Sequence, residues 1–237
     1  MELFKNKNPQ AKQESGFMTQ RRQILNEQSP FAMKEAYRTL RTNIRFALRG
    51  EGCKKFCITS SSQGEGKSIT MLNLAITFAE TGQKVLLIDA DMRRPAINRL
   101  LVEKATPGLS NVLAGLAEDA EVLRKEVRPN LDIIFSGDIP PNPAELLDSD
   151  RMKELLEKLS RRYDYILIDT PPVNVVSDAC VVANMLDGVL LLARQGRSRK
   201  ESLKRAVNNL NLAGVKLLGC VFNGVPHEVK TIYSYYD

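Results

Sequence analysis

Two kinds of segment alternate along the chain after Gly50. Short runs typical of β-strands lie at 55–60, 84–89, 131–135, 165–169, 188–193 and 215–222. Continuously apolar ones among them, such as VLLID and YILID, are typical of strands buried on both faces. Stretches with apolar residues at helical spacing lie between them, at 67–81, 151–162, 177–186 and 198–212. This succession predicts an α/β fold, a doubly wound and mostly parallel sheet with helices on both faces.

An amphipathic helix is predicted ahead of the first strand, over residues 30–49. Its apolar positions recur at helical spacing, and Ser29 before Pro30 is a typical helix start. We therefore expect three parts: a basic, flexible arm over 1–28, a main domain over 29–226 that includes this helix, and a tail over 227–237. A chain of 237 residues is long enough for one such domain with a sizeable core.

The positive charge is concentrated near the N-terminus. Residues 1–55 carry 12 Lys and Arg against 5 Asp and Glu, whereas the overall charge is +6. Such an arm can bind an anionic membrane surface or an acidic partner, or it can simply be exposed to solvent. No recognition motif accompanies the charge, so nucleic-acid binding is not favoured. The four cysteines show no metal-ligand spacing, so we expect structural burial for them. Without a targeting segment or a long apolar run, a cytoplasmic protein is expected.

A phosphate-binding loop is predicted between the first strand and the helix after it. Residues 61–68 read SSQGEGKS, which matches G-x-x-x-x-G-K-[ST] except that Ser61 replaces the first glycine. Backbone N–H groups of such a loop and the helix N-terminus hold nucleotide phosphates. Lys67 is expected to reach the β- and γ-phosphates, and Ser68 to bind Mg²⁺. The other expected nucleotide contacts are Gln63, Gly64, Glu65, Gly66 and Ile69.

Carboxylates follow two of the predicted strands. Asp89 and Asp91 close VLLIDAD, and Asp169 closes YILID. Because ligands of parallel sheets collect at the carboxyl ends of strands, the three side chains are expected to converge on Mg²⁺ and the γ-phosphate. Ser68, Asp91 and Asp169 would hold the metal, and Asp89 would orient an acceptor hydroxyl and take its proton.

From about residue 30 to its end the sequence resembles the P-loop bacterial tyrosine kinases of capsule and exopolysaccharide synthesis, in the form of the separate cytoplasmic kinase subunit. The resemblance rests on SSQGEGKS, VLLIDADMRRP, YILIDTPP, the SGxxPPNPAELL loop and the terminal tyrosines, with Asp138 as a departure in that loop. It implies a deviant-Walker, MinD/ParA-like P-loop fold with ATP and Mg²⁺ as cofactors. It also implies that Asn223 contacts adenine, although an Asn-Gly turn explains that residue equally well.

Two further features gain a role from this resemblance. Glu35, Arg38 and Arg41 match an E-x-x-R-x-x-R pattern that the family uses for ring-like self-association, while i,i+3 pairing within the helix is the alternative. Half of the six tyrosines lie in the last five residues, and the acceptors expected to be phosphorylated by a neighbouring subunit are Tyr233, Tyr235 and Tyr236. A disordered aromatic terminus is the alternative.

Arg93 and Arg94 either stabilise charge on the phosphate or form surface ion pairs.

The resemblance implies a protein-tyrosine autokinase that regulates polysaccharide synthesis and export. Its expected partners are further copies of itself, a membrane chain-length regulator that activates it and places it at the inner face of the membrane, and other proteins of polysaccharide synthesis. The alternatives are a MinD/ParA-like positioning ATPase and a nucleotide-binding scaffold. Positioning ATPases carry a second lysine early in the loop, and none lies between Ser61 and Gly66.

Overall fold

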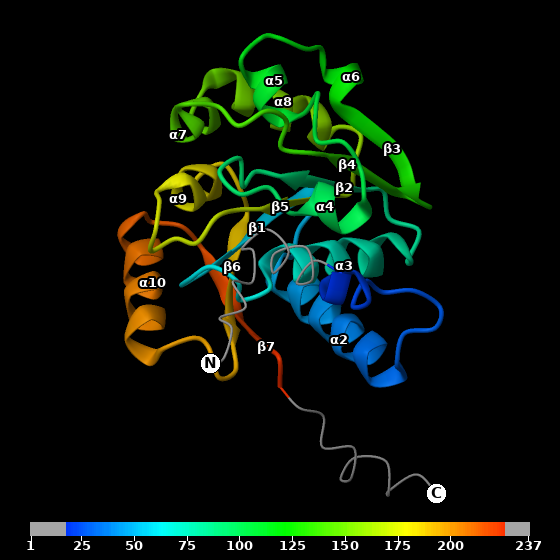
Figure 1. The fold of residues 1–237 in the computed structure, drawn as a ribbon, viewed down its shortest axis with the longest axis vertical. Helices are drawn as coiled ribbons and strands as arrows, with labels where there is room; N and C mark the ends of the chain where they lie inside the picture. The colour runs from blue at the N-terminus through cyan, green and yellow to red at the C-terminus, as the bar shows by residue number, and fades with distance from the viewer. Residues whose placement is uncertain (1–17, 226–237) are drawn as a thin grey trace, which may run out of the picture.

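A seven-stranded sheet forms the centre of the molecule in the computed structural model, which describes residues 18–225 (Figure 1). The strand order is β3-β4-β2-β5-β1-β6-β7, with β3 antiparallel to β4 and the other pairs parallel. The strands are β1 Lys54–Ser60, β2 Val85–Asp89, β3 Leu123–Arg128, β4 Leu131–Ile134, β5 Tyr165–Asp169, β6 Gly188–Arg194 and β7 Leu217–Asn223. The predicted doubly wound, mostly parallel sheet is confirmed.

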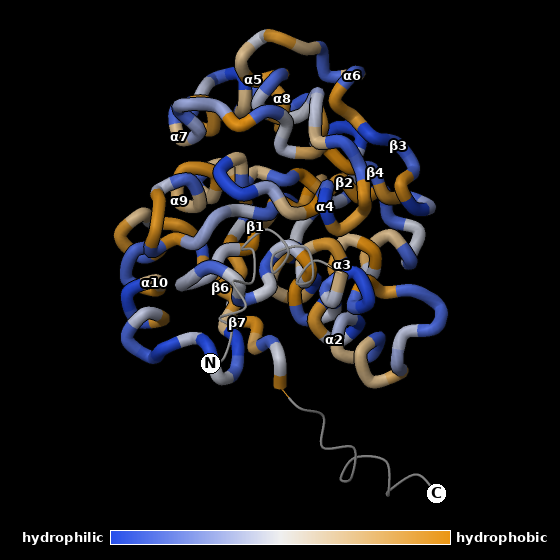
Figure 2. The backbone as a smooth tube through the Cα atoms, viewed as in Figure 1, coloured by the Kyte–Doolittle hydropathy of each residue, from blue (hydrophilic) through white to orange (hydrophobic). Residues whose placement is uncertain are grey.

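Helices cover both faces of the sheet. They are α2 Phe31–Ala47, α3 Lys67–Ala79, α4 Ile97–Leu101, α5 Leu109–Leu113, α6 Asp119–Val122, α7 Pro143–Leu147, α8 Asp150–Ser160, α9 Asp178–Ala183 and α10 Lys200–Leu212. One buried cluster joins the sheet to α2, α3 and α4, and a second joins it to α5, α8, α9 and α10. Apolar segments accordingly gather in the middle of the molecule (Figure 2).

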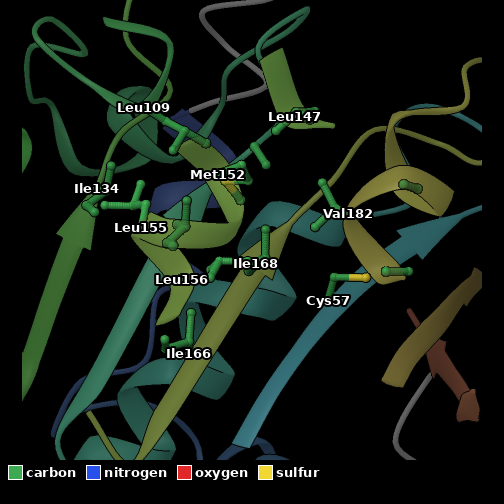
Figure 3. Close-up of a cluster of buried hydrophobic side chains, with 14 of the residues drawn as sticks. Cys57, Leu109, Ile134, Leu147, Met152, Leu155, Leu156, Ile166, Ile168 and Val182 are labelled. Carbon is green, nitrogen blue, oxygen red and sulfur yellow. The ribbon is translucent and has the colours of Figure 1, made fainter. Parts of the chain in front are cut away.

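The central strands have few polar residues in their middle positions because each strand contributes to both clusters. On β5, Ile166 and Ile168 face the cluster that contains α8 and α9, whereas Leu167 faces the one that contains α3. Figure 3 shows the cluster that contains α8 and α9, where Leu156 of α8 lies beside Ile168 of β5 and Leu155 lies toward Ile134 of β4. Alternate side chains of a strand point to opposite faces, so two covered faces require a continuous apolar run.

The structure differs from the expected flexible arm over 1–28 in its last residues. Ile24 and Leu25 are buried, and the Leu25 backbone N–H donates to Asn73 Oδ1 of α3 at 2.9 Å. The Asn73 side-chain amide donates in turn to the Gln23 carbonyl at 2.8 Å and to the Tyr37 hydroxyl at 3.2 Å. One buried amide therefore joins residues 23–25, α2 and α3, and it supplies the hydrogen bonds that a buried loop needs.

Several short elements were not predicted from the sequence. β3 reads LRKEVR and lies at the sheet edge, where its exposed positions carry charges instead of an apolar run. The helices α4, α5, α6 and α7 have at most five residues each, too short for a helical period to show. α7 lies within the SGxxPPNPAELL stretch and begins at Pro143.

The cysteines agree only in part with the expected burial. Cys57 is fully buried, whereas Cys220 is exposed, and none of the four forms a disulfide. Over residues 18–225, no helix combines the length and apolarity that crossing a membrane requires.

Candidate phosphoryl-transfer site

The predicted phosphate loop connects β1 to the N-terminus of α3. Gly64 and Gly66 adopt left-handed φ angles of 73° and 101°, which glycine accepts without strain. Lys67 is the first residue of α3 and is 7% exposed. The loop therefore presents backbone N–H groups, a helix N-terminus and one buried ammonium group, which together favour an anion.

Ser61 and Glu65 explain why the first loop position is not glycine. Glu65 is fully buried, and its carboxylate accepts hydrogen bonds from the Ser61 hydroxyl at 2.9 Å and the Ser61 backbone N–H at 3.2 Å. The Ser198 hydroxyl donates to the same carboxylate at 2.6 Å. The Glu65 side chain thus points into the protein, and only its backbone N–H remains for a ligand.

The three predicted carboxylates lie together at the ends of neighbouring strands. β2 pairs with β5 in a register that sets Asp89 opposite Asp169, and Asp91 follows two residues after Asp89. Asp89 and Asp169 are fully buried, and Asp91 is 8% exposed. Asp89 accepts hydrogen bonds from the backbone N–H groups of Asp91, Ala96 and Ile97 at 3.2–3.3 Å, which fix the chain after β2.

Burial raises the pKa of each of these carboxyl groups. It raises the pKa of Asp169 to about 7, although the positive charge of Lys67 opposes the shift. The pKa of Asp89 lies well above its usual range because of burial and the nearby Asp169 and Asp91 charges. Burial also raises the pKa of Asp91, against the effect of Lys67. Three carboxylates confined in one buried site favour either a proton or a cation between them.

Asp169 provides the test of whether this site suits a metal ion. Both of its carboxylate oxygens are buried and make no hydrogen bond of ordinary geometry within the described residues, although the Ser68 side chain lies close enough to lower the pKa of the carboxyl group. Bare buried oxygens are costly unless a cation or a proton satisfies them, and Mg²⁺ prefers carboxylate and hydroxyl oxygens. Within residues 18–225 no three His, Cys, Asp or Glu side chains form a metal cage. Mg²⁺ commonly uses one or two carboxylates, water and substrate phosphate instead, so the residues present fit this ion.

Arg93 and Arg94 have different environments. Arg93 forms a two-point ion pair with the fully buried Asp178 of α9, with Nε–Oδ2 at 2.9 Å and Nη2–Oδ1 at 3.2 Å. The Arg94 guanidinium donates to the Gln63 side-chain carbonyl at 2.8 Å, beside the phosphate loop. Arg93 is thus held in an ion pair with a buried carboxylate, and Arg94 contacts a residue of the phosphate loop.

A cavity of about 230 Å³ adjoins Asp91. Its lining combines polar groups with an apolar wall, namely Gln63, Asp91, Arg93, Arg94, Pro171, Pro172, Val175 and Val176. The Thr59 hydroxyl donates to the Pro171 carbonyl at 2.8 Å and so fixes this wall to the end of β1. The cavity can accept a flat apolar group whose polar end meets a carboxylate and a guanidinium.

Asn223 lies at the opposite side of the phosphate loop. Its side-chain amide donates to the Glu65 carbonyl at 3.0 Å and closely approaches Gly66. Asn223 and Ile69 also line a second cavity of about 560 Å³, between α2, α3 and β7. These two predicted nucleotide contacts therefore lie together beside the loop.

Asp138, the departure in the proline-rich loop, has structural contacts. Its carboxylate accepts hydrogen bonds from the Thr106 hydroxyl at 2.9 Å and the Asn111 amide at 2.8 Å. These two hydrogen bonds hold the pKa of Asp138 below its usual value. Asp138 therefore ties the loop to the start of α5.

Sequence reasoning missed the residues that hold the outside of the phosphate loop. Arg194, the last residue of β6, and Arg197 and Ser198, between β6 and α10, lie against Gly64 and Glu65. The one signal in the sequence was the basic run ARQGRSRK directly after a predicted strand.

The two arginines of the predicted self-association motif also differ. Arg38 forms an exposed i,i+3 ion pair with Glu35 at 2.6 Å. Arg41 instead donates to the Thr77 carbonyl of α3 at 2.6 Å, within the chain. The predicted acceptors Tyr233, Tyr235 and Tyr236 lie outside the described residues.

Comparison with known sequences identifies close relatives. Residues 53–195 match the model of the AAA domain family. The chain is 41% identical over 221 residues to the tyrosine-protein kinase YwqD of Bacillus subtilis, covering 93% of each. It is 35% identical to the putative tyrosine-protein kinase CapB of Staphylococcus aureus, over 86% of the chain and 90% of that relative. It is also 39% identical to the tyrosine-protein kinase Etk of Escherichia coli, but there it spans only 28% of the relative.

Solved structures give the same grouping. The kinase domain of the E. coli tyrosine kinase Etk matches with a TM-score of 0.79 and 39% identity, over 86% of this chain and 80% of that one. The septum site-determining protein MinD of Pyrococcus horikoshii, complexed with Mg-ADP, matches less well. Its TM-score is 0.61 at 25% identity, over 72% and 70% of the two chains.

Proposed function

The chain belongs to the bacterial tyrosine-protein kinases, and from this premise we propose how its site transfers the γ-phosphoryl group of ATP to tyrosine. The observation that carries the proposal is the position of Asp89, Asp91 and Asp169 at the carboxyl ends of adjacent strands, beside a loop that favours phosphate. Phosphoryl transfer requires mainly positioning and charge neutralisation, and this arrangement offers both.

The loop holds the nucleotide. The N–H groups of residues 63–68, the N-terminus of α3 and the Lys67 ammonium group bind the phosphates, and Ile69 and Asn223 border the base. Ser68, Asp91 and Asp169 hold Mg²⁺, which supplies positive charge against the phosphate oxygens when it is bound. The buried oxygens of Asp169, which make no hydrogen bond of ordinary geometry within the described residues, support its place in this set.

Asp89 takes the proton of the acceptor hydroxyl. A phenol has a pKa near 10, so it loses its proton during or after transfer. Burial raises the pKa of Asp89 well above the usual value, which makes the carboxylate a stronger base for this step. Its hydrogen bonds to the backbone of residues 91, 96 and 97 fix its position.

The cavity beside Asp91 receives the acceptor side chain. The prolines and valines of its lining offer an apolar wall to a phenol ring, and the carboxylate and the Arg94 guanidinium lie at its polar end. A short serine or threonine side chain leaves this wall uncovered, so the cavity favours tyrosine.

The acceptors are Tyr233, Tyr235 and Tyr236 of a neighbouring copy in a ring-like assembly. Glu35, Arg38 and Arg41 of α2 contribute to contacts between copies. We assign residues 29–226 to the kinase domain and 227–237 to the acceptor tail. The kinase regulates capsular or exopolysaccharide synthesis and export, acts on other proteins of that machinery, and is held at the inner face of the plasma membrane by an activating chain-length regulator.

Incubation of the full chain with ATP and Mg²⁺, alone and co-expressed with its regulator, tests the proposal. We expect phosphotyrosine at residues 233, 235 and 236 by mass spectrometry, and none in the Lys67→Met variant. Phosphate release without phosphotyrosine would instead support a positioning ATPase, and the absence of both products would support a scaffold.

A further inference from the structure

The phosphate loop is held by the end of β6 and the segment that leads from it to α10, residues 194–198. The Arg194 guanidinium donates to the Gly64 carbonyl at 3.3 Å, and the Ser198 hydroxyl donates to the Glu65 carboxylate at 2.6 Å. The Ser198 hydroxyl also accepts a hydrogen bond from the Arg194 backbone N–H at 2.7 Å, which fixes residues 194 and 198 relative to each other. Two successive loop residues therefore depend on contacts from one distant segment.

Arg197 lies against the same part of the loop. A Cβ atom built on Gly64 would lie 2.5 Å from Arg197 Nη2 and 2.7 Å from its Cζ. The guanidinium group thus occupies the space that a side chain at position 64 would need. Since the Arg197 side chain is exposed, it can change its direction when a ligand arrives at the loop.

The carboxyl groups and a bound nucleotide together carry more negative charge than the Lys67 ammonium group can neutralise. Four buried carboxyl groups lie at or behind the loop, those of Glu65, Asp89, Asp91 and Asp169. A nucleoside triphosphate with Mg²⁺ adds further negative charge, and uncompensated buried charge is costly. Arg93 is already paired with Asp178. Among the described residues, no salt bridge joins Arg194 or Arg197 to a carboxylate.

We infer that Arg197 is a second cation for the phosphates of the bound nucleotide, and that the Ser198–Glu65 hydrogen bond positions it beside the loop. The inference rests on the proposed nucleotide site. It adds to that site the Arg197 side chain, which lies after β6, whereas the phosphate loop lies after β1 and the carboxylates lie at or after the ends of β2 and β5. Because Gly64 has no side chain, the Arg197 guanidinium group can lie against the phosphate loop. Glycine at this position therefore allows both the positive φ angle of the turn and the approach of Arg197.

The alternative is that Arg197 only braces the loop. A brace stabilises the loop whatever ligand is bound, whereas a phosphate-binding cation discriminates between nucleotides with and without phosphates. The two roles therefore differ in binding affinity for ATP and adenosine, and a catalytic assay is not needed to separate them.

Displacement of a fluorescent ADP analogue from the full chain measures these affinities. For Arg197→Ala we expect about tenfold weaker binding of Mg-ATP, the value of one charge-assisted contact at a partly exposed site, and unchanged binding of adenosine. Arg197→Lys keeps the charge and recovers part of the loss. Arg199→Ala, an equally exposed arginine at the N-cap of α10, is the matched control and leaves both affinities unchanged.

A second variant tests the positioning contact. Ser198→Ala removes the hydrogen bond to Glu65, and we expect it to weaken Mg-ATP binding less than Arg197→Ala does, without further loss when the two are combined. Equal weakening of ATP and adenosine in Arg197→Ala, or no weakening, overturns the inference. If the wild-type chain binds no ATP, or binds it equally without Lys67, the proposed nucleotide site itself fails.

Discussion

Asp169 combines full burial with two carboxylate oxygens that make no hydrogen bond of ordinary geometry in the described part of the chain. Its pKa is about 7 in the folded protein, against an ordinary value of 3.8. Between these two values the folded chain binds a proton that the unfolded chain has lost. Stability of the ligand-free protein therefore falls as the pH rises through this window and levels off above about 7.

We predict that the melting temperature of the ligand-free chain is about 3–6 °C lower at pH 8 than at pH 6. The fall should shrink in Asp169→Asn, which removes the charge, and a smaller part should remain because the pKa of Asp89 is also raised. Thermal denaturation followed by circular dichroism measures both chains. An Asp169→Asn variant with the full wild-type pH dependence would contradict this account.

Single residues also show where sequence reasoning reaches its limit. The positions of Lys67 at the start of a helix and of Asp89 and Asp169 at strand ends agree with the sequence patterns, because each belongs to a recognisable strand or loop pattern. The inward direction of Glu65 was not predicted, since it depends on Ser198, which is 133 positions away. A local motif carries no information about such a partner, and the fold supplies it.

At the scale of elements, the two arginines of the predicted self-association motif on α2 have different contacts. Arg41 donates to the Thr77 carbonyl of α3, whereas Arg38 pairs only with Glu35 on an exposed face. We predict that Arg41→Ala lowers the free energy of unfolding by about 1–2 kcal/mol, the value of a lost charge-assisted hydrogen bond. Arg38→Ala should change it by less than about 0.5 kcal/mol, as exposed pairs do.

For the two variants, urea denaturation measures the free energy of unfolding, and light scattering measures the particle mass in solution. If Arg38 contacts a neighbouring copy, Arg38→Ala lowers the particle mass while the monomer keeps its stability. Unchanged mass in Arg38→Ala would refute its place in the interface. A stability loss equal in both variants would refute the difference between them.

Asn73 offers a further test at this scale, because one side chain joins three elements. It accepts from the Leu25 backbone N–H and donates to the Gln23 carbonyl and the Tyr37 hydroxyl. Asn73→Ala leaves these polar groups without their partner, so we predict a loss of about 2–4 kcal/mol in the free energy of unfolding. Thr42→Ala on the exposed part of α2 removes one hydrogen bond to the Arg38 carbonyl and serves as the control.

Elements with long, uniform patterns were predicted well from the sequence, and those without were not. β1, β2, β5 and β6 have continuous apolar runs because both faces of the sheet are covered. β3 is an antiparallel edge strand with exposed charges, so neither its pattern nor its direction follows from local sequence. Packing of residues 18–28 against α3 was missed because it depends on one buried amide.

Over the whole molecule, the sheet brings the residues of the proposed site together at the carboxyl ends of its central strands. Lys67 lies in the segment after β1, whereas Asp89 ends β2, Asp91 follows it, and Asp169 ends β5. β5 pairs with β1 on one side and with β2 on the other. The parallel order makes the carboxyl ends of these strands meet, and the phosphate loop and the cavity beside Asp91 lie there together. This end of the sheet carries a concentration of buried carboxyl groups whose negative charge a proton or a cation offsets.

That concentration determines the expected effect of autophosphorylation on assembly. Each phosphate adds about −1.5 to −2 charges, so a tail phosphorylated at Tyr233, Tyr235 and Tyr236 carries about −5 from its phosphates alone. Such a tail is repelled by the carboxylates of a neighbouring site and by other tails. We therefore predict that phosphorylation releases the tail from the neighbouring copy and dissociates the ring-like assembly.

Light scattering tests this prediction on the full chain after incubation with ATP and Mg²⁺. We expect a lower particle mass for the phosphorylated chain than for Lys67→Met, and recovery of the larger mass after treatment with a tyrosine phosphatase. A variant with phenylalanine at the three tail positions should keep the larger mass under the same conditions, because it gains no phosphate there. If the phosphate-saturated chain keeps the mass of the unphosphorylated one, electrostatic repulsion does not govern assembly.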